Sequence, residues 1–223
     1  MSVLSLFHMR KDAKRFGLRL RRDIQGTAAI ELVLLTPMLL LFMMGTLEVS
    51  RAINVDKRIN SVTAMAGDLI AREDKLNNAD LNAIMDVVSH VMNPYNPSDL
   101  KLSVIPVMAD AADATKTLVY ADPFKYNGGV SGTPTANSCY SFSGSTNVMT
   151  KGSTVIVVKA EYTYTPLYVD FFDGWSFLPT MTSSNIGWDN GGNTFTDQSI
   201  HSPRQGCVDF DNNNCVVSTP GGC

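Results

Sequence analysis

The chain has 223 residues, enough for one large domain or for a smaller domain with appendages. Its formal net charge of −3 hides an asymmetry, because residues 1–26 carry seven Arg and Lys against two Asp, whereas residues 27–223 carry 11 basic and 19 acidic side chains. The larger part therefore lacks the basic face that nucleic-acid binding requires, and we expect no nucleic-acid partner.

An apolar run follows the basic segment and extends from Ala28 to Leu47. Its length of about 20 residues corresponds to about 30 Å of helix, which matches the bilayer core. Positive charge before such a run favours the cytoplasmic side. We expect residues 1–26 to be a cytoplasmic leader and residues 27–47 a transmembrane helix, kinked at Pro37, with Thr36 able to satisfy a freed backbone group. A basic tail that binds RNA or lipid weakly is one alternative, and a cleaved secretory signal peptide is another, although residues 45–48 contain no small-residue cleavage site.

One carboxylate, Glu31, lies inside the apolar run, five positions after Gly26. An ionisable group in such a span is costly, and its presence points to a function. The arrangement resembles a prepilin-type signal, which is cut after the glycine and would leave Thr27 with a positive α-amine. Glu31 would then lie one turn away, where it could pair with that amine or with the amine of a neighbouring subunit. The alternative is a carboxylate that reaches the lipid headgroups without a specific partner.

Residues 48–73 show the clearest helical periodicity in the chain, with apolar residues spaced 3, 4, 3, 4 and 3 apart. These helix-seam residues are Ala52, Val55, Ile59, Val62, Ala66 and Leu69. Neither proline nor a turn cluster interrupts residues 38–73, so one helix could leave the membrane and continue as an amphipathic helix over residues 48–76. The seam could pack on its own domain, on another subunit, or on both.

An α+β domain is expected over residues 77–223. Residues 77–80 predict a helix cap and the apolar spacing from Leu81 to Met92 predicts a second helix, which Asn93–Pro97 ends. Three strands are expected in a small antiparallel sheet, over residues 101–106, 117–120 and 154–165. Residues 127–153 predict a surface excursion, residues 167–178 a short helix or a cover, and the last 40 residues mostly loop held by disulfides.

All four cysteines lie in this domain, at Cys139, Cys207, Cys215 and Cys223. An even number in a segment expected outside the cytoplasm predicts disulfides, and the three possible pairings remain open. Cys207–Cys215 would close a short loop, and Cys139–Cys223 would then attach the C-terminus to the domain. The spacings do not suit zinc. Residues 209–214 place oxygen ligands at alternate positions but lack the glycine and glutamate of a calcium loop, so we favour a disulfide-closed turn and expect neither metal nor cofactor.

The histidines lie far apart in the sequence, at His8, His90 and His201. Neither a phosphate-binding glycine loop nor a His-Glu-x-x-His string is present. We therefore expect a protein that is not an enzyme.

Three sequence segments are similar to the TadE/TadG-like proteins of bacterial tight-adherence (Tad, Flp-type) pilus systems. They are residues 22–31, the Leu-rich run with Thr36-Pro37, and residues 68–72, while residues 162–167 resemble the C-terminal part of that family. The string Asp-x-Ser-x-Ser of the larger members is absent, which favours the shorter TadE-like branch. Leu32 departs from the aromatic residue that follows the glutamate in the family's major pilins.

The resemblance implies a minor pilin or pseudopilin in the bacterial inner membrane, with its C-terminal domain in the periplasm. Its partners would be a prepilin peptidase, other pilus subunits, the inner-membrane assembly platform and membrane lipid. The alternative is an uncleaved single-pass anchor whose periplasmic domain binds a partner or ligand. A tethered hydrolase would need catalytic residues that the sequence does not present.

Overall fold

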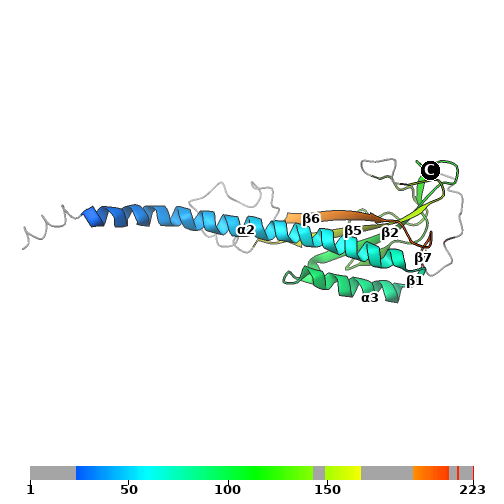
Figure 1. The fold of residues 1–223 in the computed structure, drawn as a ribbon, viewed down its shortest axis with the longest axis horizontal. Coiled ribbons are helices and arrows are strands. Elements are labelled where there is room, and N and C mark those ends of the chain that lie inside the picture. The colour runs from blue at the N-terminus through cyan, green and yellow to red at the C-terminus, as the bar shows by residue number, and fades with distance from the viewer. Residues whose placement is uncertain (1–23, 143–148, 167–192, 211–214, 216–222) are drawn as a thin grey trace, which may run out of the picture. The chain divides into compact units, whose positions relative to one another are not determined.

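A computed structural model describes residues 24–142, 149–166, 193–210, 215 and 223. The chain divides into two compact units, Met1–Val49 and Ser50–Cys223. The first contributes the beginning of a long helix, and the second contains the rest of that helix, a second helix, an antiparallel sheet and two disulfides (Figure 1). The α+β class expected from the sequence is therefore confirmed.

The long helix, α2, runs without interruption over Ile24–Arg72 and contains Pro37. Proline cannot donate to the carbonyl four residues before it, which here belongs to Val33. The Thr36 hydroxyl instead donates to the carbonyl of Leu32, at 2.6 Å. The expectation that Thr36 satisfies the backbone group freed by Pro37 is therefore wrong, because its hydroxyl bonds to a different carbonyl.

The second helix, α3, spans Asn78–Ser89 and begins with a capping box. The Asn77 side chain accepts from the backbone N–H groups of Ala79 and Asp80, and the Asp80 carboxylate accepts from the N–H of Asn77. Two short 3-10 helices follow, η1 (His90–Met92) and η2 (Pro97–Asp99), with a cis peptide bond between Asn93 and Pro94. The predicted second helix and its cap are confirmed, and the Pro-rich stretch connects it to the sheet.

Five antiparallel strands form the main sheet, in the order β3-β2-β5-β6, with β4 also paired to β2. They are β2 (Leu100–Ala109), β3 (Thr117–Val119), β4 (Phe124–Tyr126), β5 (Thr154–Tyr164) and β6 (Asn193–His201). A separate pair, β1 (Lys75–Leu76) and β7 (Asp209–Phe210), is parallel. Three of the main-sheet strands lie where the sequence predicted strands.

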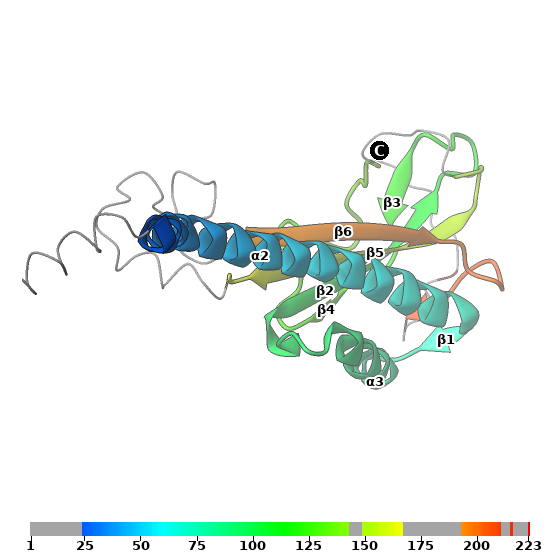
Figure 2. The same ribbon diagram turned by 60° about the vertical axis from the view of Figure 1, so that its left-hand side comes forward.

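The sheet has a core on each face. Figure 2 shows the second half of α2 and helix α3 beside one face of the sheet. Leu102 and Val104 of β2 and Val158 of β5 belong to the core on this face. On the other face, alternate residues of the same strands pack beneath Tyr140 and Met149. Strands β2 and β5 are consequently buried on both faces, which explains their nearly continuous apolar sequence.

The last 40 residues were expected to be mostly loop, and this prediction is wrong for β6. The strand pairs along its whole length with β5, with Asp197 opposite Ala160. Its composition is polar and includes Asn, Asp and Gln, so propensity does not identify it, and pairing with a buried neighbour overrides that weak preference. The element expected at residues 167–178 lies outside the described residues.

Candidate functional site

The first half of α2 presents apolar side chains on all sides within its own unit. Leu34, for example, is 71% exposed, and Ile30, Leu32, Val33 and Phe42 are also exposed. The helix is long and apolar enough to cross a membrane, with a mean hydropathy of 2.0 in its most apolar stretch. An apolar patch of this extent requires lipid or another protein to cover it.

Glu31 is exposed among these apolar residues, and Gly26 has open space around it, with nothing within 4 Å of an added Cβ. Both belong to the beginning of α2, which starts at Ile24. The proposed cleavage point between Gly26 and Thr27 therefore falls within the first turn of the helix. Glu31 is the eighth residue of α2, so it lies beyond the first turn, to which the favourable effect of the free backbone N–H groups is confined.

The second half of α2 reverses this pattern. Of the six helix-seam residues, Val55, Ile59, Val62 and Ala66 are buried, and Ala52 and Leu69 are half-buried against the same core. Ile70 is also fully buried, although the seam spacing ended at Leu69. The interval of four residues from Ala66 to Ile70 is equally helical and could have identified it.

Polar contacts attach α2 to the edge strand β6, and the sequence analysis did not identify them. The Thr63 side chain is fully buried, and its hydroxyl donates to the Asp197 carboxylate. The Asn60 amide, oriented by its hydrogen bonds, donates to both oxygens of Asp197 at 3.0 and 3.1 Å. The Ser199 hydroxyl donates to the backbone carbonyl of Thr63 at 2.8 Å. The Asp197 carboxylate thus accepts hydrogen bonds from two side chains of the helix.

One turn further along α2, Gly67 allows the closest approach to β6. A Cβ added to Gly67 would lie 2.1 Å from a ring carbon of His201, so a larger residue cannot fit without movement. Just beyond, the backbone N–H of Arg204 donates to the carbonyl of Ala71, and Arg204 lies 3.6 Å from the Asp68 carboxylate. We call Asn60, Thr63, Gly67, Asp197, Ser199 and His201 the helix–strand contact. It fixes the position of this half of α2 along the sheet.

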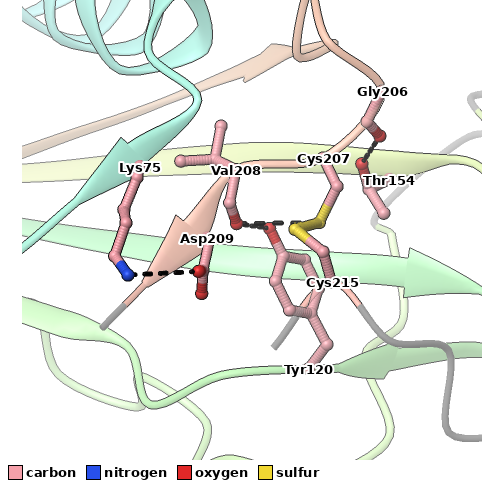
Figure 3. The surroundings of a disulfide bond; sticks show 8 residues. All are labelled: Lys75, Tyr120, Thr154, Gly206, Cys207, Val208, Asp209 and Cys215. Atoms are coloured by element: carbon pink, nitrogen blue, oxygen red, sulfur yellow. Dashed lines mark hydrogen bonds and ion pairs between the residues drawn. A yellow bond between two sulfur atoms is a disulfide. The ribbon is translucent and has the colours of Figure 1, made fainter. Parts of the chain in front are cut away.

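The segment after β6 is held at several points around the Cys207–Cys215 disulfide (Figure 3). Thr154 Oγ1 donates to the carbonyl of Gly206, and the Tyr120 hydroxyl donates to the carbonyl of Val208 at 2.9 Å. Asp209 lies 3.7 Å from Lys75. Burial raises the pKa of Tyr120 far above its usual value, so this hydroxyl stays protonated and remains a donor.

The four cysteines form two disulfides, Cys207–Cys215 and Cys139–Cys223. The pairing that the sequence left open is thereby assigned. The first links Cys207, just before β7, to Cys215, and the second joins Cys223 to Cys139, which forms an isolated bridge with Leu118 of β3. Of residues 209–214, which place oxygen ligands at alternate positions, residues 211–214 lie outside the described residues. Among the residues that are described, no three His, Cys, Asp or Glu side chains gather as metal ligands.

An ion pair between Lys101 and Glu161 lies on the sheet face opposite the helices. Lys101 Nζ lies 3.1 Å from Glu161 Oε1, and Ser131 Oγ donates to Glu161 Oε2 at 3.3 Å. Burial works to raise the pKa of Glu161, but the hydrogen bonds and the charge of Lys101 outweigh it, so the pKa lies below the usual value. The carboxylate is therefore ionised and joins β2, β5 and the loop after β4.

Comparison with known protein families places residues 26–68 in the TadE-like protein family. The matched segment begins at the glycine of the proposed signal and ends in the second half of α2, so it contains Glu31, Pro37 and most of the helix seam. Searches of curated proteins and of solved structures each found no significant match. The family resemblance inferred from the sequence is confirmed for this segment, and the TadE-like family is pilus-related.

Proposed function

We propose that this chain is a minor pilin or pseudopilin of a Tad-type pilus, processed by a prepilin peptidase after Gly26. The observation that carries the proposal is the TadE-like match, which coincides with the helix that is exposed and apolar in its first half. In this proposal residues 1–26 are a cytoplasmic leader, the helix crosses the inner membrane, and Ser50–Cys223 lies in the periplasm. Prepilin peptidase, pilus subunits, the assembly platform and lipid are the proposed partners.

Glu31 is the proposed assembly residue. Cleavage after Gly26 creates a positive amine on Thr27, four residues before the carboxylate and thus one helical turn away. A charge pair in an apolar medium is stronger than in water, since the dielectric constant is low. An amine that exists only after cleavage would therefore connect processing to the docking of neighbouring helices.

Processing can be tested by N-terminal sequencing of the membrane-extracted chain. We expect the sequence to start at Thr27, and the Gly26→Val variant to retain residues 1–26. A Leu47→Val variant, which also alters the apolar segment, serves as the matched control and should be processed normally. Full-length chain alone, in cells with an active prepilin peptidase, would contradict the proposal.

The role of Glu31 can be tested with Glu31→Gln, which removes the charge and keeps the size. Insertion should survive, because losing a charge from the span makes insertion easier. We expect normal abundance and cleavage but loss of surface pili, scored by electron microscopy. Asp56→Asn, a similar change on an exposed position of the same helix, should leave pili intact. Wild-type piliation of Glu31→Gln cells would favour a carboxylate that only reaches the headgroups.

An uncleaved anchor remains a second candidate, since α2 continues through Gly26 and Thr27 without a break. Its periplasmic unit would then bind a partner while the helix stays in the membrane. The intact mass of the extracted protein distinguishes the two, because only cleavage removes the mass of residues 1–26.

A further inference from the structure

A groove of about 550 Å³ opens in the Ser50–Cys223 unit, and no residue of the helix–strand contact lines it. It lies where β1, the start of α3, the β3–β4 connection and β7 meet. Its volume is within the range of small-ligand sites. Four buried apolar residues contribute to its lining, namely Leu76, Leu81, Ala121 and Phe210.

Polar side chains also line this groove. Asn78 begins α3, Asp122 lies in the β3–β4 connection, and Asn137 follows in the next loop. All three are exposed, and none of their side chains has a hydrogen-bond partner among the described residues. Tyr120 and Phe124 are half-buried and add aromatic rings beside them. The groove thus combines free amide and carboxylate groups with aromatic surface.

The charge of the lining decides which ligands fit. The described lining residues include neither Lys nor Arg, and Asp122 is negative, so phosphates and other anions are disfavoured. The N-terminus of α3 offers no substitute, because its capping box already occupies the N–H groups of Ala79 and Asp80. The four buried apolar residues leave little surface open, so the accessible apolar part of the groove is that of the half-buried Tyr120 and Phe124 rings. A partner protein would therefore lack a deep pocket for an apolar anchor.

We propose that this groove binds a neutral oligosaccharide. Sugar hydroxyls both donate and accept hydrogen bonds, as the amides of Asn78 and Asn137 do, and the Asp122 carboxylate accepts from them. The apolar C–H face of a sugar ring can pack on the rings of Tyr120 and Phe124. This site is independent of pilus membership, so its test can fail without affecting the proposed function, and the reverse is also true.

Saturation-transfer difference NMR on the full chain in detergent micelles tests the proposal. The neutral probes are chitotetraose and cellotetraose, the anionic probe is a heparin tetrasaccharide, and the cationic probe is tetralysine. We expect transfer to at least one neutral sugar and none to heparin. Absence of transfer to both neutral sugars, or stronger binding of tetralysine or heparin, would overturn the proposal.

Variants then assign the binding to the groove. Asp122→Ala and Asn137→Gly should each weaken binding of the neutral sugar about 5–10-fold, the loss expected for one hydrogen bond. Glycine is chosen at position 137 because Asn137 has a φ of +61°, which alanine would strain. Asn54→Ala, at an exposed position of α2, is the matched control and should bind like the wild type. Unchanged binding in both groove variants would reject this groove as the site.

Discussion

The two halves of α2 belong to one uninterrupted helix, but they differ in the exposure of their apolar side chains. Before Val49 the apolar side chains are exposed within their unit, as at Leu34, whereas after Ser50 they are buried, as at Ile59 with 1% exposure. The apolar side chains of the first half therefore need lipid or an apolar partner to cover them. Those of the second half are covered by β2, β5 and β6 of the same unit. Helix propensity cannot distinguish the halves, but the periodicity of apolar residues does.

The largest effect should come from the Cys139–Cys223 disulfide, which stabilises only the second unit. In the chain-entropy description, a separation of 84 residues predicts a loss of about 4–5 kcal/mol in the free energy of unfolding, against about 2–3 kcal/mol for the 8-residue Cys207–Cys215 separation. Paired Cys→Ser variants, compared by denaturant unfolding of the detergent-solubilised chain, measure this difference. Equal losses would contradict the ranking.

Truncation of the helix core should separate the two halves directly. Ile59→Ala removes fully buried methyl groups and should cost about 2–5 kcal/mol of unfolding free energy. Ile30→Ala makes the same change at a side chain that is 63% exposed and should leave the unfolding of the second unit unchanged. The two melting curves, measured in the same detergent, provide the comparison, and similar shifts would show that the halves are not energetically distinct.

The close approach at Gly67 predicts a smaller loss. In Gly67→Ala the new methyl group would overlap the His201 ring, and we expect a cost of about 1–3 kcal/mol, as for overpacked cores. His201→Ala should relieve the overlap, so the double variant should be more stable than Gly67→Ala alone. A double-mutant cycle with additive losses would show that the ring is not the cause.

The smallest effect should be the acid sensitivity caused by Glu161. Because its pKa in the folded chain lies below the usual value of 4.5, its contribution is present above about pH 4.5 and is lost as the pH falls through the lowered value. The contribution should be at most about 1 kcal/mol, since Lys101 is half-exposed. Thermal melts at pH 6 and pH 3 should show a smaller difference for Glu161→Gln than for the wild type.

Apolar periodicity revealed both helices and the two central strands. The helix cap at Asn77 could also be predicted from the sequence, because a capping box is a local pattern. Strand β6 could not be predicted in this way, because polar side chains occur on both of its faces. It forms a strand because it pairs with β5. The contacts of Thr63 and Gly67 with β6 could not be predicted either, because the sequence contains no local sign of a contact more than 130 residues away.

Within the candidate site, the roles of Gly26 and Glu31 stay predictions from their spacing beside basic residues, whereas disulfides could be predicted from the number of cysteines and are present. The pairing of the cysteines required the fold. The helix–strand contact required it too, since threonine in a helix is ordinary and only the position of β6 shows why Thr63 is buried with its hydroxyl bonded.

The helix–strand contact also has a consequence for the order in which the protein can be completed. Thr63 is bonded to Asp197 and Ser199, which follow it by 134 and 136 residues. On a growing chain, the second half of α2 is synthesised more than 130 residues before its polar partners in β6. Contacts between residues this far apart form slowly, because the intervening chain must lose entropy first. Until β6 is synthesised, Thr63 and the neighbouring apolar residues lack their β6 partners. During this interval a chaperone or a protease could bind the exposed helix.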